Sequence, residues 1–166
     1  MKDLLDKLST YNVFNYLLPG VLFAAFVDGL TSLRVLQKDL VVGVFLYYFL
    51  GSVVSRVGSL IVEPILLKMK FVQYAPYPAF LQATKVDAKI ELLSEQNNMY
   101  RTFIALFISV AVVAVYDKAS KSTPSLHSAA PYVCIAGLLV LYLFSYRKQT
   151  AFVKQRVDQA KHSSKP

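Results

Sequence analysis

Four apolar stretches separated by polar segments make up most of the chain. They cover about residues 13–33, 40–67, 102–118 and 127–146. The second exceeds the roughly 20 residues that a helix needs to cross the hydrocarbon core of a bilayer, and the other three are near or just under that length. The pattern predicts an all-α membrane protein, with four transmembrane helices in a single membrane domain over residues 1–166.

Two polar segments lie between and after these stretches. Residues 68–101 contain Pro76 and Pro78, which break the second helix and predict a turn at the level of the lipid headgroups. The rest of this segment places apolar residues on one side and charged residues on the other, which predicts an amphipathic cytoplasmic helix. Residues 147–166 contain no Pro or Gly before Pro166, so they predict a helical basic C-terminal extension.

Composition and charge give the location and the orientation. The chain is 55% hydrophobic with a mean hydropathy of +0.46, which is too apolar for a soluble domain of 166 residues. The net charge of +8 is uneven, because thirteen Lys and Arg residues lie in the N-terminal arm, residues 68–101 and the tail, against four in the two short connecting turns. By the positive-inside rule, we expect a multi-pass protein with both termini in the cytoplasm.

The second apolar stretch has one polar face. At 100° per residue, six polar side chains fall on the same side of the helix: Tyr48, Ser52, Ser55, Arg56, Ser59 and Glu63. Gly51 lies at the border of this face, and with Ser55 and Ser59 it forms a row of small residues that lets another helix approach closely. A charge at bilayer depth costs about 2.5 to 3.5 kcal/mol, so Arg56 and Glu63 are expected to be paired with another charge, to be hydrated, or to serve the function of the protein.

The sequence leaves the role of this polar face open. Arg56 and Glu63 are about 10 Å apart along the helix axis, so a direct pair needs both side chains extended, and a bridge to another helix or subunit is the alternative. A dry seam would only fix helix packing, a wet seam would line a water-filled conduit, and a catalytic role is the third interpretation. We therefore take the six residues as a candidate pore-lining or intersubunit seam.

The first apolar stretch contains a predicted kink. Pro19 cannot donate a backbone hydrogen bond to the carbonyl of Asn15, and Gly20 loosens the next turn. In a membrane the freed carbonyl needs a partner, so the kink is expected to face the bundle interior. A fixed change of helix direction and a gating hinge are the two interpretations.

Basic residues gather in the predicted cytoplasmic segments. Candidates for binding an anion or a partner are Lys85, Lys89, Arg101, Arg147, Lys148, Lys154 and Arg156. Gathered around a symmetry axis, they would attract a polyanion such as an oligonucleotide. The alternative is that they only set the topology and contact anionic membrane lipid.

Catalytic and metal-binding motifs are missing from the sequence. It contains no HExxH, GxSxG, Walker loop or CxxC, and its single cysteine is Cys134. The predicted topology places His127 and His162 near opposite faces of the membrane. We therefore expect a protein that is not an enzyme and that needs no cofactor and no metal.

Three stretches support a resemblance to a known group of proteins. The chain opens with the kinked "YNVFNYLLPGVLF", continues through "SRVGSLIVEPIL" and enters the third apolar stretch through "NNMYRTF". In these features it resembles the small four-helix membrane components of bacterial anti-phage defence operons, of the Hailong or Kiwa kind. The resemblance implies an inner-membrane oligomer that works with a cytosolic partner from the same operon in an abortive-infection response.

The two kinds imply different functions. A Hailong-like component is an ion-channel effector controlled by a nucleotide signal, whereas a Kiwa-like component is a sensor that recruits a cytosolic DNA-binding partner. We favour the channel-forming effector, with a homotetramer as the expected assembly, because a polar face beside small residues suits packing around an axis. The alternative is a membrane sensor or scaffold that docks a cytosolic partner and conducts no ions.

Overall fold

The computed structural model describes residues 13–163, which contain helices and connecting segments but no strand. Two of the helices, η1 and η2, are single π-helical turns. The elements are η1 (Val13–Leu17), α2 (Leu18–Leu30), α3 (Leu40–Val57), η2 (Gly58–Val62), α4 (Glu63–Lys68), α5 (Tyr77–Val86), α6 (Lys89–Ser120) and α7 (Pro124–Ser163). The N-terminal arm before Val13 and the last three residues of the predicted tail lie outside the described residues.

Helices of the membrane type dominate the fold. Three are long and apolar enough to cross a membrane by length and composition: Leu40–Lys68, Lys89–Ser120 and Ser125–Lys161. A shorter apolar helix covers Asn15–Leu30. The prediction of an all-α chain with apolar helices of spanning length is thereby confirmed.

The structure joins segments that are separate in the hydropathy pattern. The predicted amphipathic helix and the third apolar stretch form the single helix α6, and the fourth stretch continues into the extension as α7. The turn predicted at Pro76 and Pro78 separates α4 from α5. Lys70 adopts a positive φ of 57° just after α4, and Pro78 lies in the first turn of α5.

Each π-helical turn comes just before a proline. η1 ends two residues before Pro19, and η2 ends two residues before Pro64. A proline ring collides with the carbonyl four residues earlier, and a wider turn with hydrogen bonds five residues apart relieves that collision. In η2 the N–H of Glu63 accordingly donates to the carbonyl of Gly58. Pro19 and Asn15 are buried, so the predicted irregularity of the first helix faces the protein interior.

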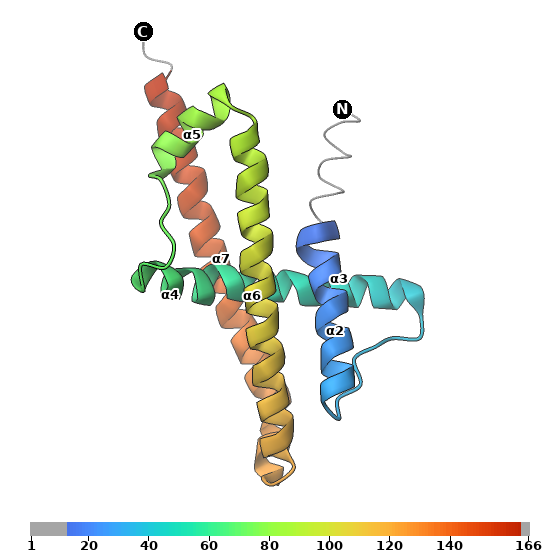
Figure 1. The fold of residues 1–166 in the computed structure, drawn as a ribbon. Helices are drawn as coiled ribbons and strands as arrows, with labels where there is room; N and C mark the ends of the chain where they lie inside the picture. The colour runs from blue at the N-terminus through green and yellow to red at the C-terminus, as the bar shows by residue number, and fades with distance from the viewer. Residues whose placement is uncertain (1–12, 164–166) are drawn as a thin grey trace.

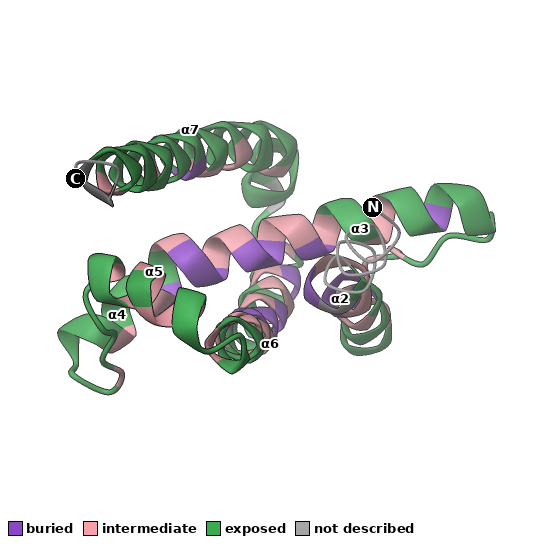
Figure 2. Cartoon of the chain, turned by 90° about the horizontal axis from the view of Figure 1, so that it is seen from above, coloured by how far each residue is buried: buried purple, intermediate pink, exposed green. Residues whose placement is uncertain are grey.

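The continuous rod of α3, η2 and α4 crosses the other long helices instead of running beside them (Figure 1). Viewed from above, α2 and α6 are seen nearly end-on while α3 lies lengthwise (Figure 2). We call the level at which this rod contacts the other helices the crossing level. The turn end, at the bottom of Figure 1, holds the end of α2 and the turn at residues 121–123. α5 and the C-terminal half of α7 lie on the other side of the crossing level.

Glycines let α2 and α3 approach until their backbones touch. A Cβ atom on Gly20 would overlap the carbonyl of Tyr47, and a Cβ atom on Gly51 would overlap the carbonyl of Tyr16. Only glycine fits at such a contact, because every other residue carries that Cβ atom. The predicted close approach of another helix at Gly51 is confirmed, and the partner is the first helix of the same chain.

A small core fills the angles between α2, the crossing rod and α6. Its buried apolar residues are Val27, Val54, Val62, Ala105, Leu106 and Val110. Gly58 allows the rod to approach α6, because a Cβ atom there would lie 3.3 Å from the Cβ atom of Ala105. α7 takes little part in this core and is exposed along most of its length (Figure 2). Three helices therefore pack tightly, and the fourth is attached to them at few points.

Polar contacts fasten the turn end. The buried Asp117 of α6 accepts a hydrogen bond from the hydroxyl of Ser32, and its carboxylate lies 2.8 Å from the Nζ atom of Lys121. Ser32 belongs to the segment that follows α2. This contact therefore ties α6 to the first helix, while α7 has no part in it.

The segment of residues 31–39 has no regular structure. It runs from the turn end back to the start of α3 at the crossing level (Figure 1). Asp28 supports it, because one oxygen of its carboxylate accepts the backbone N–H groups of Val35 at 3.0 Å and Leu36 at 3.3 Å. The other oxygen lies 3.3 Å from the exposed guanidinium of Arg34.

Candidate functional site: a cationic cavity beyond the crossing level

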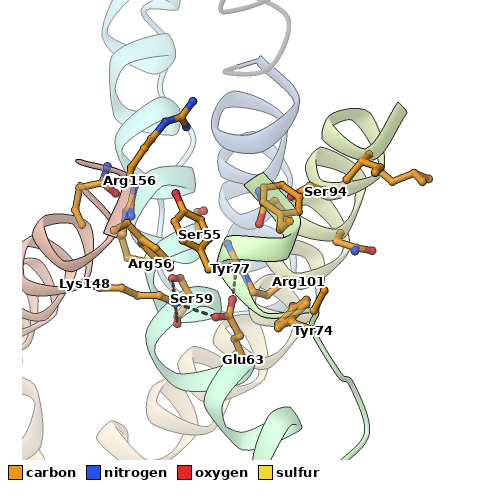
Figure 3. A pocket seen from close by; sticks show the side chains of 18 of the residues that line it. Ser55, Arg56, Ser59, Glu63, Tyr74, Tyr77, Ser94, Arg101, Lys148 and Arg156 are labelled. Carbon is orange, nitrogen blue, oxygen red and sulfur yellow. Dashed lines mark hydrogen bonds and ion pairs between the residues drawn. The ribbon is translucent and has the colours of Figure 1, made fainter. Parts of the chain in front are cut away.

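A cavity of about 980 Å³ lies between the crossing rod, α5, α6 and α7. Its lining includes the polar residues Tyr16, Ser55, Arg56, Ser59, Glu63, Gln73, Tyr74, Tyr77, Ser94, Asn97, Asn98, Arg101, Lys148, Gln149 and Arg156. Figure 3 shows Lys148, Arg56 and Arg156 on one side, Arg101 on the other, and Glu63 between them. Residues far apart in the sequence thus face one cavity.

Glu63 is held by two cations from two other helices. One oxygen of its carboxylate lies 2.9 Å from the Nζ atom of Lys148, and the other accepts a hydrogen bond from the guanidinium of Arg101. The same Nζ atom donates to the hydroxyl and to the carbonyl oxygen of Ser59, both at 2.9 Å. We call Ser59, Glu63, Arg101 and Lys148 the clamp. It joins the crossing rod to α6 and α7 (Figure 3).

The clamp forms where the apolar stretches end. Arg101 comes directly before the apolar part of α6, and Lys148 is the second residue after the apolar part of α7. The two helices are joined by a short turn at their other ends, so these cations reach the same level. The side chains of Glu63, Arg101 and Lys148 are only 15%, 18% and 28% exposed. Charges with so little contact with water require partners.

Arg56 is not the partner of Glu63. Of the two alternatives for Glu63, the structure has the bridge to other helices, and the pair within the second helix is not formed. Among residues 13–163, neither Arg56 nor Arg156 forms an ion pair. Four cations and one carboxylate therefore line the cavity, with an excess of three positive charges.

Arg101 also has an unused donor. Its Nε atom is buried and has no hydrogen-bond partner within the described part of the chain. A buried donor without a partner costs about 1 to 3 kcal/mol. The Arg101 side chain thus carries one unsatisfied donor that is buried behind the cavity surface.

Aromatic side chains form the wall between α5 and α7. The ring of Tyr77 lies 5.4 Å from the ring of Phe152 and 6.4 Å from that of Phe80, measured between centroids. The Nζ atom of Lys148 lies 5.9 Å from the centroid of Phe152, within the range of a cation–π contact. The wall is therefore attached to the clamp through Lys148.

Tyr74 contributes a neutral donor. Its phenol lies in the segment between α4 and α5, outside the apolar stretches. Partial burial and the nearby carboxylate of Glu63 raise the pKa of Tyr74 above its usual range. The phenol accordingly remains protonated at neutral pH.

The structure divides the predicted polar seam between two roles. Ser55, Arg56, Ser59 and Glu63 line the cavity. Tyr48 and Ser52 do not: the ring of Tyr48 meets that of Tyr16 edge-on at 5.4 Å, and the hydroxyl of Ser52 lies 2.9 Å from that of Tyr142 on α7. Only the four seam residues nearer α4 thus line the cavity.

The predicted basic surface is divided as well. Arg101, Lys148 and Arg156 line the cavity. The remaining candidates are exposed and lie outside its lining: Lys85, Lys89, Arg147 and Lys154. These four are available to a ligand or partner on the outer surface.

Several lining residues were missed by the sequence analysis. They are Tyr16, Gln73, Tyr74, Tyr77, Ser94, Asn97, Asn98 and Gln149. Asn97 and Asn98 gave a usable signal, since two amides lie one turn before Arg101 on a helix that becomes apolar directly afterwards. The residues around the two prolines gave none, because their position depends on how the chain turns between α4 and α5.

A second, smaller pocket adjoins the cavity. Its volume is about 400 Å³, and it shares Glu63, Gln73, Tyr74, Asn97 and Arg101 with the first. The rest of its lining is mainly apolar and aromatic: Leu66, Phe71, Val72, Tyr100 and Ile104. The cationic cavity therefore continues into an apolar groove.

Comparison with protein-family models, with curated proteins and with solved structures finds no match to the chain. Within residues 13–163, no three His, Cys, Asp or Glu side chains gather in a way that could hold a metal ion. The interpretation of the cavity rests on its own geometry.

Proposed function

We propose that this protein is a non-enzymatic effector of bacterial anti-phage defence, which assembles in the inner membrane as a homo-oligomer and forms an ion channel. A cytosolic signal opens it. The signal is a nucleotide or a partner protein from the same operon, and it acts on the basic surface of the extension of α7. Both termini lie in the cytoplasm.

The contact that supports this proposal is the ion pair between Lys148 and Glu63. Lys148 lies where α7 leaves its apolar stretch, and Glu63 lies on the polar face of the crossing rod. Since Lys148 also bonds Ser59, a ligand that moves the extension of α7 also displaces the polar face. Gating needs such a connection between a binding surface and the element that changes position.

In this proposal α2, α6 and α7 stand upright in the bilayer, and the crossing rod lies near its cytoplasmic boundary. The part of α6 between Arg101 and Asp117 is about 24 Å long, which covers most of a hydrocarbon core of about 30 Å. The four-span alternative stands the rod upright as well. The crossing in Figure 1 favours the first arrangement, because spanning helices tilt by at most about 40°.

A cysteine-labelling experiment distinguishes these arrangements. Lys38→Cys and Ser122→Cys are made separately in a Cys134→Ser background, and cells are treated with a membrane-impermeant thiol reagent. We expect labelling from outside at position 122 and none at position 38. Labelling from outside at both positions would support the four-span arrangement.

Residues 31–39 support the proposed oligomer. In the upright arrangement they lie at the depth of the bilayer, where irregular backbone is tolerated only if protein covers it. Leu36 within this segment is 48% exposed in the single chain, and a neighbouring copy is the proposed cover. Chemical crosslinking in membranes is expected to give a ladder that ends at four copies of the 18.6 kDa chain. A ladder that ends at two copies, or no ladder, would contradict the tetramer.

Planar-bilayer recording tests the channel directly. With mononucleotides, oligonucleotides or a cytosolic extract of phage-infected cells added on the cytoplasmic side as candidate signals, the purified protein is expected to give discrete conductance steps, and Lys148→Gln is expected to change their open probability. Lys118→Gln removes the same charge from an exposed position at the turn end, away from the proposed signal-binding surface, and is expected to leave the steps unchanged. Bilayers that contain the protein and stay silent after mononucleotides, oligonucleotides and a cytosolic extract of phage-infected cells are added would exclude the channel.

A second candidate is a sensor or scaffold that docks a cytosolic partner. The contacts of Ser59 and Glu63 favour it, because a polar face that bonds within its own chain suits a packing seam. The extension of α7 also exposes Val153 and Val157 by 54% and 46%, and these residues offer a docking face. Copurification of one defined cytosolic protein, lost on Val153→Asp, together with silent bilayers would establish this function instead.

A further inference from the structure

We propose that the cationic cavity binds the headgroup of an anionic phospholipid from the cytoplasmic leaflet, and that the adjoining apolar groove receives the start of an acyl chain. Such a lipid would be a resident ligand of the fold. The site stands whether or not the protein conducts ions.

The cavity lies at the level of lipid headgroups. Arg101 and Lys148 mark the positions at which α6 and α7 change from polar to apolar sequence, and both line the cavity. Tyr74 and Tyr77 line it as well, and tyrosines favour the boundary between lipid and water. Basic pockets between helices on the cytoplasmic side are known to suit anionic headgroups.

The charge of the cavity matches a phosphodiester. Glu63 balances part of the charge of Arg101 and Lys148, whereas Arg56 and Arg156 have no ion pair among residues 13–163. Arginine presents several N–H groups in a plane and suits the oxygens of a phosphate. The amides of Asn98 and Gln149 and the phenol of Tyr77 add uncharged donors for the rest of the headgroup.

The apolar groove favours a lipid over a soluble phosphate compound. It begins at Arg101 and is bordered by Phe71, Tyr100 and Ile104, which are 76%, 59% and 40% exposed. A soluble anion leaves these side chains in water, whereas an acyl chain covers them. Each buried methylene contributes about 0.8 kcal/mol. A lipid headgroup and a soluble phosphate compound both carry a phosphate ester, so the arginines suit either. The apolar groove is the feature that favours the lipid.

The test uses the full-length protein in detergent and a short-chain lipid that can be titrated. Dioctanoyl phosphatidylglycerol is added, and bound lipid is counted by native mass spectrometry. Dioctanoyl phosphatidylcholine has the same chains without net charge, while glycerol 3-phosphate and ATP carry phosphate without chains. We expect phosphatidylglycerol to bind, and an equal concentration of either chain-free compound not to displace it.

Two matched double variants locate the binding. Arg56→Gln with Arg156→Gln removes two charges from the cavity without touching the clamp, and is expected to weaken phosphatidylglycerol binding by roughly tenfold or more. Arg147→Gln with Lys154→Gln removes the same charge from the exposed surface of α7, and is expected to weaken it less than about threefold. Circular dichroism confirms that both variants keep the helical content of the wild type.

Three results would overturn the assignment. Equal weakening by the two double variants would mean that lipid is attracted by the overall charge and not by the cavity. Displacement by ATP or glycerol 3-phosphate would make the cavity a site for soluble phosphate compounds. Equal binding of phosphatidylcholine would show that the arginines are not used.

Discussion

Acidic residues organise both the crossing level and the turn end, but in different ways. Glu63 has two cationic partners, 38 and 85 residues away in the sequence, and joins three helices. Asp117 has one cationic partner, Lys121, which lies four residues away just past the end of the same helix and is 61% exposed, and one distant hydroxyl partner in Ser32. An acid shared between distant helices fixes tertiary structure, whereas an acid paired within its own helix mainly supports that helix.

Helix packing is also tighter at the crossing level than in the rest of the molecule. Gly20 and Gly51 at the crossing level allow two backbones to touch. Gly137, in the middle of α7, has open space around it, because a Cβ atom added there would meet no atom of another segment within 4 Å. α7 is correspondingly attached at the crossing level, by Lys148 and by the hydroxyl contact between Ser52 and Tyr142. The crossing level is therefore expected to respond to small substitutions much more strongly than the rest of the molecule.

The largest effect is expected for Glu63→Gln. The substitution leaves Arg101 and Lys148 partly buried without a counter-ion, which is expected to cost roughly 3 kcal/mol of the free energy of unfolding. Thermal unfolding in detergent, followed by circular dichroism, measures it. Phe49→Leu on the exposed side of α3 is the control, with an expected cost below about 1 kcal/mol. Equal stability of the two variants would refute the clamp as a structural tie.

A somewhat smaller effect is expected for Gly51→Ala. The added methyl group meets the carbonyl of Tyr16 and forces α2 and α3 apart, at an expected cost of about 2 kcal/mol. Gly137→Ala is the matched control, because it has free space and gains up to about 1 kcal/mol of helix propensity. The same thermal unfolding measurement compares them. A stabilising Gly51→Ala would mean that the helices do not touch at this point.

Lys148→Gln is expected to cost about 1.5 kcal/mol, because Glu63 keeps Arg101 as a partner when the ion pair with Lys148 and the two hydrogen bonds from Lys148 to Ser59 are lost. Its stronger consequence is loss of the attachment of α7, which we expect to show as faster amide hydrogen exchange in residues 147–163. Lys154→Gln is the control and is expected to change neither quantity. Unchanged exchange in Lys148→Gln would place the attachment of α7 elsewhere.

The smallest effect is expected at the turn end, for Asp117→Asn. Asparagine can still accept the hydrogen bond from Ser32, and the lost partner Lys121 is well exposed to solvent. The expected cost is therefore below about 1 kcal/mol by thermal unfolding. A cost equal to that of Glu63→Gln would remove the difference between the two ends.

The fold class could be predicted well, and the site only in part. Hydropathy and length gave an all-α chain with spanning-length helices, because apolar runs of this length have no other stable form in a bilayer. The polar face of the second helix was found from its period, and Arg101 and Lys148 from their charge. The pairing of Glu63 with both of them could not be found, because helical period fixes the face of a residue but not which helix meets it.

The sequence by itself determined what each segment is: helical, apolar or basic, irregular at Pro19, broken at Pro76 and Pro78, and open to a close neighbour at Gly51. These properties depend on residues within one or two turns of each other. Only the tertiary structure decided that the second stretch crosses the other helices, that Glu63 and not Arg56 meets the distant cations, and that aromatic residues from α5 and α7 close the cavity. Those outcomes depend on contacts between segments up to 90 residues apart, whose geometry is fixed by the packing of whole helices and not by any local pattern.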